Sequence, residues 1–436
     1  MDLLKQKFST RSTAFKAELK TLMAAHAETV IDHVTLDQAV GGMRGIKSMF
    51  WVTSDLDANK GITFRGFSIP QLQEKLAKAE GDQEPLPEAL FWLMLTDTFP
   101  TDEEVKWLSA QWQTRAEVPA HVFAVLDTLP VDCHPMTQFI IAITAMQTDS
   151  VFSKRYAEGM PKSEYWDATY EDTMNLVARL PRVAAYIYRR SFKGGQHIAA
   201  DPQLDWAANF AHMLGFEQKD FRSLMRLYMT IHADHEGGNA SAHATHLTGS
   251  TLSDAYLSLA AGMTALAGPL HGLANQEVIK WIFDMLDQLG TQNPTEEQIG
   301  DFVKKTLTEG KVVPGYGHAV LRVPDPRFIA QMKFAEQYLP ESEIVKVVWR
   351  VYNVVPPILE NLGKVKNPWP NVDAHSGALL VHYGLTEYDF YTVLFGVSRA
   401  MGVLAQLCWS RALGLPLERP KSITLEWAKA KVEKGV

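Results

Sequence analysis

The sequence has little cysteine and no long hydrophobic run. Its 436 residues include two cysteines, Cys133 and Cys408, too few and too far apart in sequence for a disulfide framework or a thiolate zinc site. A reducing compartment is therefore expected. The longest apolar stretch that we tested as a membrane span, residues 255–268, is shorter than the roughly 20 residues that a span needs. We therefore expect no transmembrane segment.

An excess of positive charge is also missing. The formal net charge is −8 and the isoelectric point is about 6.0, which argues against nucleic acid or an anionic membrane as a partner. The charge is unevenly distributed, because residues 311–436 contain 15 Lys and Arg against 11 Asp and Glu. An anionic ligand would therefore favour the C-terminal third of the chain.

The first 20 residues do not resemble a targeting segment. They mix acidic with basic side chains and lack an uninterrupted apolar core, so neither a secretory signal nor a transit peptide is expected. A cytoplasmic location is our expectation. A mitochondrial matrix protein whose presequence has been removed is the alternative.

Helical patterns dominate the sequence. Capping-box spacings at 101–104 and 295–298 precede amphipathic runs, and residues 386–389 imitate the same start for a long apolar helix that stops at Gly414. Evidence for strands is confined to 49–54 and 62–67, which favour a small hairpin near the N-terminus. The predicted fold class is all-α with this minor hairpin.

Three short segments combine one titratable side chain with glycines or prolines. Such residues end regular structure and let a ligand approach the backbone. Two histidines and one carboxylate form an acid/base set. The segments are GPLHGLANQE (268–277) with His271, VPGYGHAVLR (313–322) with His318, and NVDAHSG (371–377) with Asp373.

Each of the three residues has an ordinary structural alternative. His271 at a helix start would be a neutral hydrogen-bond donor, or it merely caps that helix. His318 follows glycines that free backbone N–H groups for a ligand, or it lies in a plain glycine-rich turn. Asp373 in a stiff, partly apolar loop would be a strong base, or it is a turn residue. Their joint occurrence favours the functional interpretation.

Three arginines in the C-terminal third accompany this set. Arg327, Arg399 and Arg419 could grip an anionic substrate through charge-assisted hydrogen bonds. Arg399 stands among apolar residues of the expected long helix, where an unpaired guanidinium is costly. It therefore needs a carboxylate, either from the protein or from the substrate.

The segment IHADHEGGNASAHATH (231–246) contains four histidines and suggests a metal site at first sight. Zinc hydrolases of the His-Glu-x-x-His type need their histidines on one continuous helix. Here Gly237 and Gly238 interrupt it. The same glycines suit an anion pocket, to which His235 and Asn239 would add donors. No metal is therefore expected, and a zinc hydrolase remains an alternative.

Taken together, these segments resemble citrate synthase of the type found in eukaryotic mitochondria and some bacteria. The resemblance runs from GGMRGIK (41–47) to LERPKS (417–422). It implies an all-α homodimer in which a large dimer-forming domain (1–272 and 380–436) carries a small domain (273–379) that closes over the site.

The resemblance also implies a reaction and roles. Asp373 would deprotonate acetyl-CoA while His271 donates to the thioester oxygen, His318 would polarise the ketone of oxaloacetate, and hydrolysis of citryl-CoA would give citrate and CoA without metal or cofactor. This is the first step of the citric acid cycle. The alternatives are 2-methylcitrate synthase, which uses propionyl-CoA, and a non-catalytic binding protein.

The remaining site residues follow from the same resemblance. Ser241 would orient His271, and closure on oxaloacetate would complete the CoA site. Lys162 departs from the arginine that related proteins often carry. The residues implied for oxaloacetate or citrate are His235, Asn239, Arg327, Phe395, Arg399 and, shared across the dimer, Arg419. Those implied for CoA are Arg44, Lys162, Val312, Val313, Gly315, Gly317, Arg322, Lys364, Lys366 and Asn371.

Overall fold

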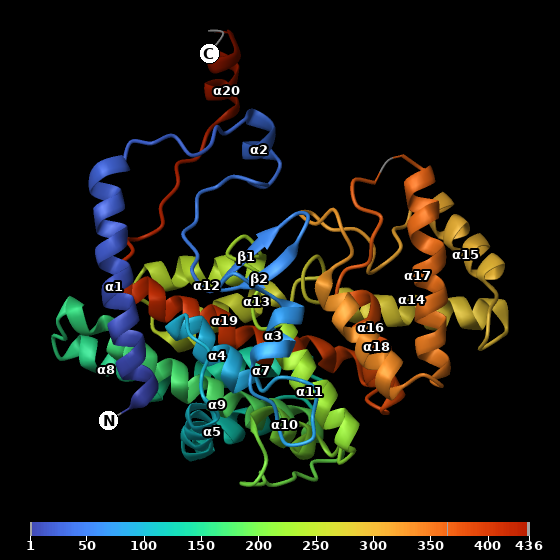
Figure 1. Cartoon of the computed structure of the whole chain (residues 1–436), viewed down its shortest axis with the longest axis horizontal. Helices are drawn as coiled ribbons and strands as arrows, with labels where there is room; N and C mark the ends of the chain where they lie inside the picture. The colour runs from blue at the N-terminus through green and yellow to red at the C-terminus, as the bar shows by residue number, and fades with distance from the viewer. Residues whose placement is uncertain (1, 364, 434–436) are drawn as a thin grey trace.

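The computed structural model describes residues 2–363 and 365–433, and helices form most of it (Figure 1). The expected all-α class is confirmed. The first helices are α1 Leu3–His26, α2 Leu36–Val40, α3 Ile69–Lys75, α4 Pro87–Thr96, α5 Asp102–Arg115, α6 Ala120–Asp127, α7 Pro135–Ala145, α8 Val151–Ala157, α9 Tyr165–Phe192 and α10 Trp206–Leu214. The later ones are α11 Lys219–Ile231, α12 Ala240–Ser250, α13 Ala255–Leu266, α14 Ala274–Leu289, α15 Glu296–Thr308, α16 Pro326–Tyr338, α17 Glu343–Asn361, α18 Asp373–His382, α19 Tyr391–Leu413 and α20 Leu425–Glu433.

Helix α19 is the centre of the core. All of its residues are buried, and α1, α4, α9, α11, α12 and α13 pack around it. Among the described helices it is the one that is long and apolar enough to pass a test for a membrane span, yet its apolar window lies entirely inside the protein. We interpret α19 as a core helix.

The helix ends predicted from neighbouring residues are confirmed at three positions. Thr101 and Thr295 form the expected capping boxes of α5 and α15, and Gly414, with φ of +72°, ends α19 as expected. The start predicted at 386–389 is wrong. A 3₁₀ turn at Tyr388–Phe390 precedes α19, which has no side-chain cap.

The small sheet has the order β1-β2-β3, with antiparallel strands β1 Ser54–Asp57, β2 Gly61–Phe64 and β3 Phe67–Ser68. The first strand begins at Ser54, so the strand expected at 49–54 is largely wrong. Side chains of Asp234 and of Gln406 in α19 hydrogen-bond to the preceding segment instead. The N–H of Val52 donates to the Gln406 side chain of α19 at 2.8 Å, and this bond competes with strand pairing.

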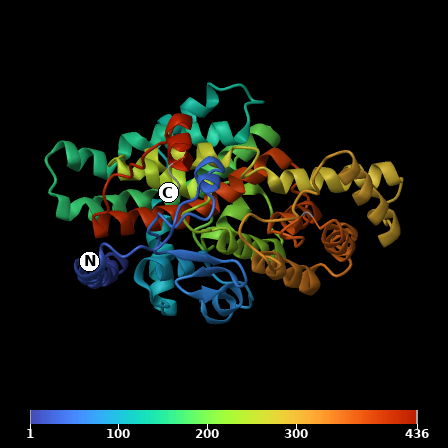
Figure 2. The same ribbon diagram turned by 90° about the horizontal axis from the view of Figure 1, so that it is seen from above.

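Helices α14 to α18 form a group beside the remaining helices, coloured yellow to orange in Figures 1 and 2. Within it, α14 packs against α18, α15 against α17, and α16 against α18. The expected small domain, 273–379, covers this group except for the end of α18, which continues to His382.

Gly402 brings α19 into contact with the loop that follows α11. Its N–H donates to the Ala233 carbonyl at 3.1 Å, and an added Cβ would collide with that carbonyl and with Asp234. Gly300 in α15 differs, because its added Cβ would make an ordinary contact with Val354 at 3.6 Å.

We therefore expect Gly402→Ala to lower the free energy of unfolding by about 1–3 kcal/mol, since overpacking forces the backbone apart. The matched control, Gly300→Ala, should raise stability by roughly 0.5–1 kcal/mol, because alanine favours a helix interior. Denaturant unfolding of both variants checks this. Unchanged stability of Gly402→Ala would contradict the packing argument.

Candidate active site

One cavity lies between the α14–α18 group and the helices around α19. It encloses about 940 Å³ of empty space, part of it open to solvent. Nine of the residues expected at the site line it: His235, Asn239, His271, His318, Arg327, Asn371, Asp373, Phe395 and Arg399. They come from the loop before α12, the turn before α14, the loops before α16 and α18, the first turns of those two helices, and α19 itself.

The His271 ring is held as a neutral donor. The backbone N–H of Ser241, in the first turn of α12, donates to its Nε2 at 3.2 Å, which assigns the proton of the neutral ring to Nδ1. Burial and then the charge of Arg399 lower the pKa of His271 to about 4. The ring stands in the turn before α14 rather than inside its first turn. The Nδ1–H group is therefore available at neutral pH.

His318 is neutral for a similar reason, with the opposite tautomer. The backbone N–H groups of Val320 and Leu321 both donate to its Nδ1 at 3.0 Å, so the proton belongs to Nε2. Burial and the charge of Arg327 lower the pKa of His318 to about 4. Its ring centre is 5.5 Å from that of His235.

Asp373 begins α18 at the edge of the cavity. Its N–H donates to the Asn371 side chain at 3.0 Å. Burial raises the pKa of Asp373 to about 6, and the charge of Arg327 opposes this rise. The group is a stronger base than an ordinary aspartate and is still ionised at neutral pH.

The two arginines of the cavity differ in their surroundings. The Arg399 guanidinium donates to the His232 carbonyl at 3.1 Å and to the Asn239 side-chain oxygen at 2.9 Å. It lies 4.8 Å from the Phe395 ring centre. No carboxylate of the described residues is within ion-pair distance of Arg399. Burial lowers the pKa of Arg399 to about 10, so it remains charged.

Arg327, by contrast, is paired inside the protein. Its guanidinium makes two parallel bonds to Asp325, from Nε to Oδ1 at 3.0 Å and from an outer nitrogen to Oδ2 at 2.6 Å. Both residues are buried. The sequence interpretation missed Asp325, although its place before Pro326 at the start of α16 marks it as a helix cap.

The histidine-rich segment places one of its histidines, His235, at the cavity. The ring of His232 donates to the Tyr228 carbonyl at 2.9 Å, while His235 faces the cavity with a buried Nε2 that has no partner among the described residues. Within the same residues, no group of three or more His, Cys, Asp or Glu side chains is arranged to hold a metal ion.

Two loops expected to meet CoA are joined beside the cavity. The N–H of Asn371 donates to the Gly315 carbonyl at 2.9 Å, and the N–H of Gly317 donates to the Trp369 carbonyl at 3.0 Å. Gly315 has φ of +79°, and an added Cβ there would collide with Val278. Val313 is buried, while Val312, Arg322 and Lys366 are exposed near these loops.

Arg44, Lys162 and Arg419 are expected residues that do not line this cavity. Arg44 and Arg419 are exposed on segments outside it, and Lys162 lines a separate hollow beside the segment 410–417. Lys364 lies outside the described residues.

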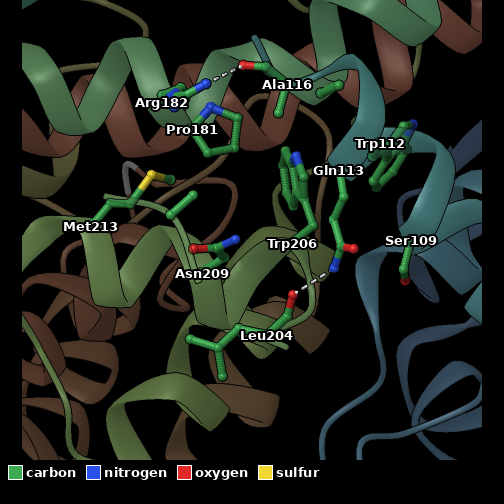
Figure 3. A pocket seen from close by; sticks show the side chains of 12 residues that line it. Ser109, Trp112, Gln113, Ala116, Pro181, Arg182, Leu204, Trp206, Asn209 and Met213 are labelled. Atoms are coloured by element: carbon green, nitrogen blue, oxygen red, sulfur yellow. Dashed lines mark hydrogen bonds between the residues drawn. The ribbon is translucent and has the colours of Figure 1, made fainter. Parts of the chain in front are cut away.

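A smaller hollow between α5, α9 and α10 contains none of the expected residues (Figure 3). Its empty space is about 390 Å³, and Trp112, Pro181, Trp206 and Met213 contribute to its wall. The Arg182 side chain at its rim donates to the Ala116 carbonyl at 3.4 Å. It offers no acid/base pair of the kind that lines the first cavity.

Two neutral donors, one base of raised pKa and two buried guanidinium groups surround a single cavity. This all-α fold and site define an enzyme that performs acid/base chemistry on an anionic substrate. The sequence model of the family described as "Citrate synthase, C-terminal domain" matches residues 42–421. The chain therefore belongs to the citrate synthase family.

Individual relatives agree with this assignment. Mitochondrial citrate synthase of Daucus carota is 56% identical over 96% of this chain and 88% of its own, and that of Saccharomyces cerevisiae is 54% identical over 99% and 90%. The citrate synthase structure from Pyrobaculum aerophilum has a TM-score of 0.75 at 26% identity and covers 88% of this chain and 92% of its own. The chain is an acyltransferase of the citrate (Si)-synthase type that condenses acetyl-CoA with oxaloacetate. The propionyl-CoA alternative is not favoured.

The histidine geometry makes a direct prediction. Because burial and a neighbouring arginine lower both pKa values to about 4, the rings of His271 and His318 should stay neutral between pH 8 and pH 5. Titration of histidine-labelled protein by NMR measures this, with His271→Gln and His318→Gln to assign the signals. Protonation of either ring near pH 6.5 would contradict the assigned donor states.

Proposed function

We propose that Asp373 and His271 together activate acetyl-CoA. Asp373 takes a proton from the acetyl methyl group, and the Nδ1–H of His271 donates to the thioester oxygen as negative charge develops there. Support comes from the raised pKa of Asp373 and from the Ser241 N–H bond that leaves Nδ1 as the donor. The observation that carries the proposal is that this base and this donor line the same cavity as Arg399.

His318 serves the second substrate. Its Nε2–H would polarise the ketone of oxaloacetate and protonate the alkoxide formed when the acetyl carbon attacks, which gives citryl-CoA. Water then hydrolyses the thioester to citrate and CoA. A neutral imidazole is suited to this step because it has a proton to donate. It carries no positive charge, so it does not compete with the arginines for the carboxylates of the substrate.

The carboxylates of oxaloacetate would be bound by Arg399 and Arg327, with His235 and Asn239 as further donors and Phe395 as the wall of the acetyl site. Arg399 is the stronger attraction, since it touches no carboxylate of the described chain. In the structure from Thermoplasma acidophilum, whose title names carboxymethyl coenzyme A and oxaloacetate, a chain of this fold binds both kinds of ligand. No metal or further cofactor is expected.

CoA would bind along the joined loops around Gly315 and Asn371, with Val312, Val313 and Gly317 beside the adenine and Arg322, Lys364 and Lys366 near its phosphates. The small domain, residues 273–379, would close on oxaloacetate and complete this surface. Such closure protects acetyl-CoA from hydrolysis before the second substrate is in place.

A homodimer would complete the site with Arg419 of the partner subunit and place Arg44 and Lys162 near the CoA phosphates. In one chain the segments that carry α2 and α20 project from the body (Figure 1). They expose apolar side chains such as Ile31, Val40 and Trp427. Exposed apolar side chains gathered on two neighbouring segments mark an interaction surface.

The mitochondrial matrix is the better-supported location. The relatives from Daucus carota, Arabidopsis thaliana and Saccharomyces cerevisiae are all named mitochondrial. The cytoplasmic expectation has no such support. The matrix location also agrees with a step of the citric acid cycle that consumes acetyl-CoA.

Release of free CoA thiol by the purified protein tests the reaction and the base together. We expect release with acetyl-CoA only when oxaloacetate is present, and much slower release with propionyl-CoA. Because the pKa of Asp373 is about 6, kcat/KM for acetyl-CoA should fall about tenfold per pH unit below pH 6. Asp373→Asn should abolish release. Near-normal turnover of this variant, or no acid limb near pH 6, would contradict the assignment of the base.

Subunit mixing tests the shared arginine. Asp373→Ala and Arg419→Ala should each inactivate the homodimer, whereas a mixed dimer contains one site with both residues intact. After denaturation and refolding of equal amounts, about a quarter of the wild-type activity should return. Refolding each variant alone is the control. If Arg419 served its own subunit, the mixture would stay inactive.

A further inference from the structure

Asp234 is a buried carboxylate next to the proposed substrate-binding residue His235. Its Oδ2 accepts from the Trp51 indole N–H at 3.0 Å, the Thr53 hydroxyl at 2.5 Å and the Ser54 hydroxyl at 2.8 Å. Its Oδ1 accepts the N–H of His235 at 2.9 Å. A carboxylate with four donors is costly to disturb, because each donor would lose a charge-assisted bond in a buried place.

The three side-chain donors belong to the segment just before and at the start of β1. This segment is tied to the loop after α11 a second time, since the Ser54 hydroxyl accepts the N–H of Glu236 at 2.9 Å. The Trp51 ring also lies over Gly237, where an added Cβ would collide with it. Gln406 of α19 binds the same segment through the N–H of Val52. The segment, the loop and α19 are thus fixed to one another around Asp234.

Asp234 also balances charge at the cavity. Burial lowers the pKa of Arg399, and Asp234 is the carboxylate that most opposes this lowering. The two groups are not in ion-pair contact. The negative charge therefore stabilises the buried guanidinium without occupying its donors, which stay available for a substrate carboxylate.

The other end of the hairpin reaches the opposite side of the cavity. The N–H of Arg322 donates to the Ala58 carbonyl at 2.7 Å, and Gly61 lies so close to Pro326 that an added Cβ would collide with its ring. The hairpin that Asp234 anchors therefore also contacts the loop that carries His318 and the first turn of α16, which carries Arg327.

We propose that Asp234 is a positioning residue for oxaloacetate: it locks the β1 segment onto the loop of His235 and holds His235 and Arg399 in their binding geometry before the substrate arrives. This inference rests on the proposed roles of His235 and Arg399. Asp234 itself would touch neither substrate, because it is buried and does not line the cavity.

The Asp234→Asn variant keeps the shape of the side chain but removes its charge and turns one acceptor into a donor. We expect the KM for oxaloacetate to rise about tenfold or more, because at least one charge-assisted bond is lost and the binding geometry relaxes. The KM for acetyl-CoA should stay within about twofold, because Asp234 bonds none of the residues proposed for CoA. Steady-state kinetics with thiol detection separates the two constants.

Asp172→Asn is the matched control. Asp172 is also buried and accepts three bonds, from the Ser150 hydroxyl and the N–H groups of Val151 and Phe152, but it does not line the cavity. This variant should lower the melting temperature and leave both KM values within about twofold. If it raises the KM for oxaloacetate as much as Asp234→Asn does, the effect is general destabilisation and the proposal is wrong.

Two further variants complete the test. If Asp234→Asn does not fold, Trp51→Phe removes a single donor and should raise the KM for oxaloacetate about two- to fivefold. If Asp234→Asn folds, or Trp51→Phe in its place, and the KM for oxaloacetate is unchanged, the proposal is wrong. Arg399→Lys, measured alongside, should also raise this KM. If Arg399→Lys leaves this KM unchanged, the proposed function is wrong. If Arg399→Lys raises it but Asp234→Asn and Trp51→Phe do not, the proposed function stands and only the proposed role of Asp234 is wrong.

Discussion

The burial of the Arg399 charge is the constraint on which the site depends. A guanidinium inside a core helix is tolerated when hydrogen bonds satisfy its donors and a negative charge is near. Here a carbonyl of His232 and the side chain of Asn239 supply the bonds, and Asp234 supplies the charge at a distance. The loop after α11 must keep its shape for these partners to stay in place. Its shape in turn depends on the contact with Gly402 and on the segment before β1.

This arrangement explains why a helical protein keeps a small sheet. The hairpin buries Ile62 and Phe64 in the core, and it joins the loop of His235 at one end and the loop before α16 at the other. These two loops come from opposite sides of the cavity, and the hairpin connects them through its own hydrogen bonds to each loop.

How much the sequence could predict depends on the range of the interaction. His271, His318 and Asp373 were identified because glycine and proline mark their loops within a few residues, and the capping boxes at Thr101 and Thr295 are local in the same way. The start of the first strand was misplaced because Asp234 and Gln406 lie some 180 and 350 residues away. Asp234 was missed for the same reason, since its three side-chain donors lie some 180 residues away. Asp325 differs, because its partner Arg327 is two residues along the chain and its place before Pro326 is a local signal of a helix cap. Arg44, Lys162 and Arg419 stay outside the cavity of one chain, and their proposed roles need a second chain.

The same physical cause produces both the acid and the base of the site. Removal from water disfavours the charged form of any group, so it lowers the pKa of a histidine and raises that of an aspartate. At the cavity this single effect makes His271 and His318 neutral donors and Asp373 a stronger base. The charge of the arginines lowers the pKa of both residue types, so it adds to the effect of burial on the histidines and opposes the effect of burial on Asp373. The positive charge that attracts the anionic substrate therefore also keeps the base ionised and the donors uncharged at neutral pH.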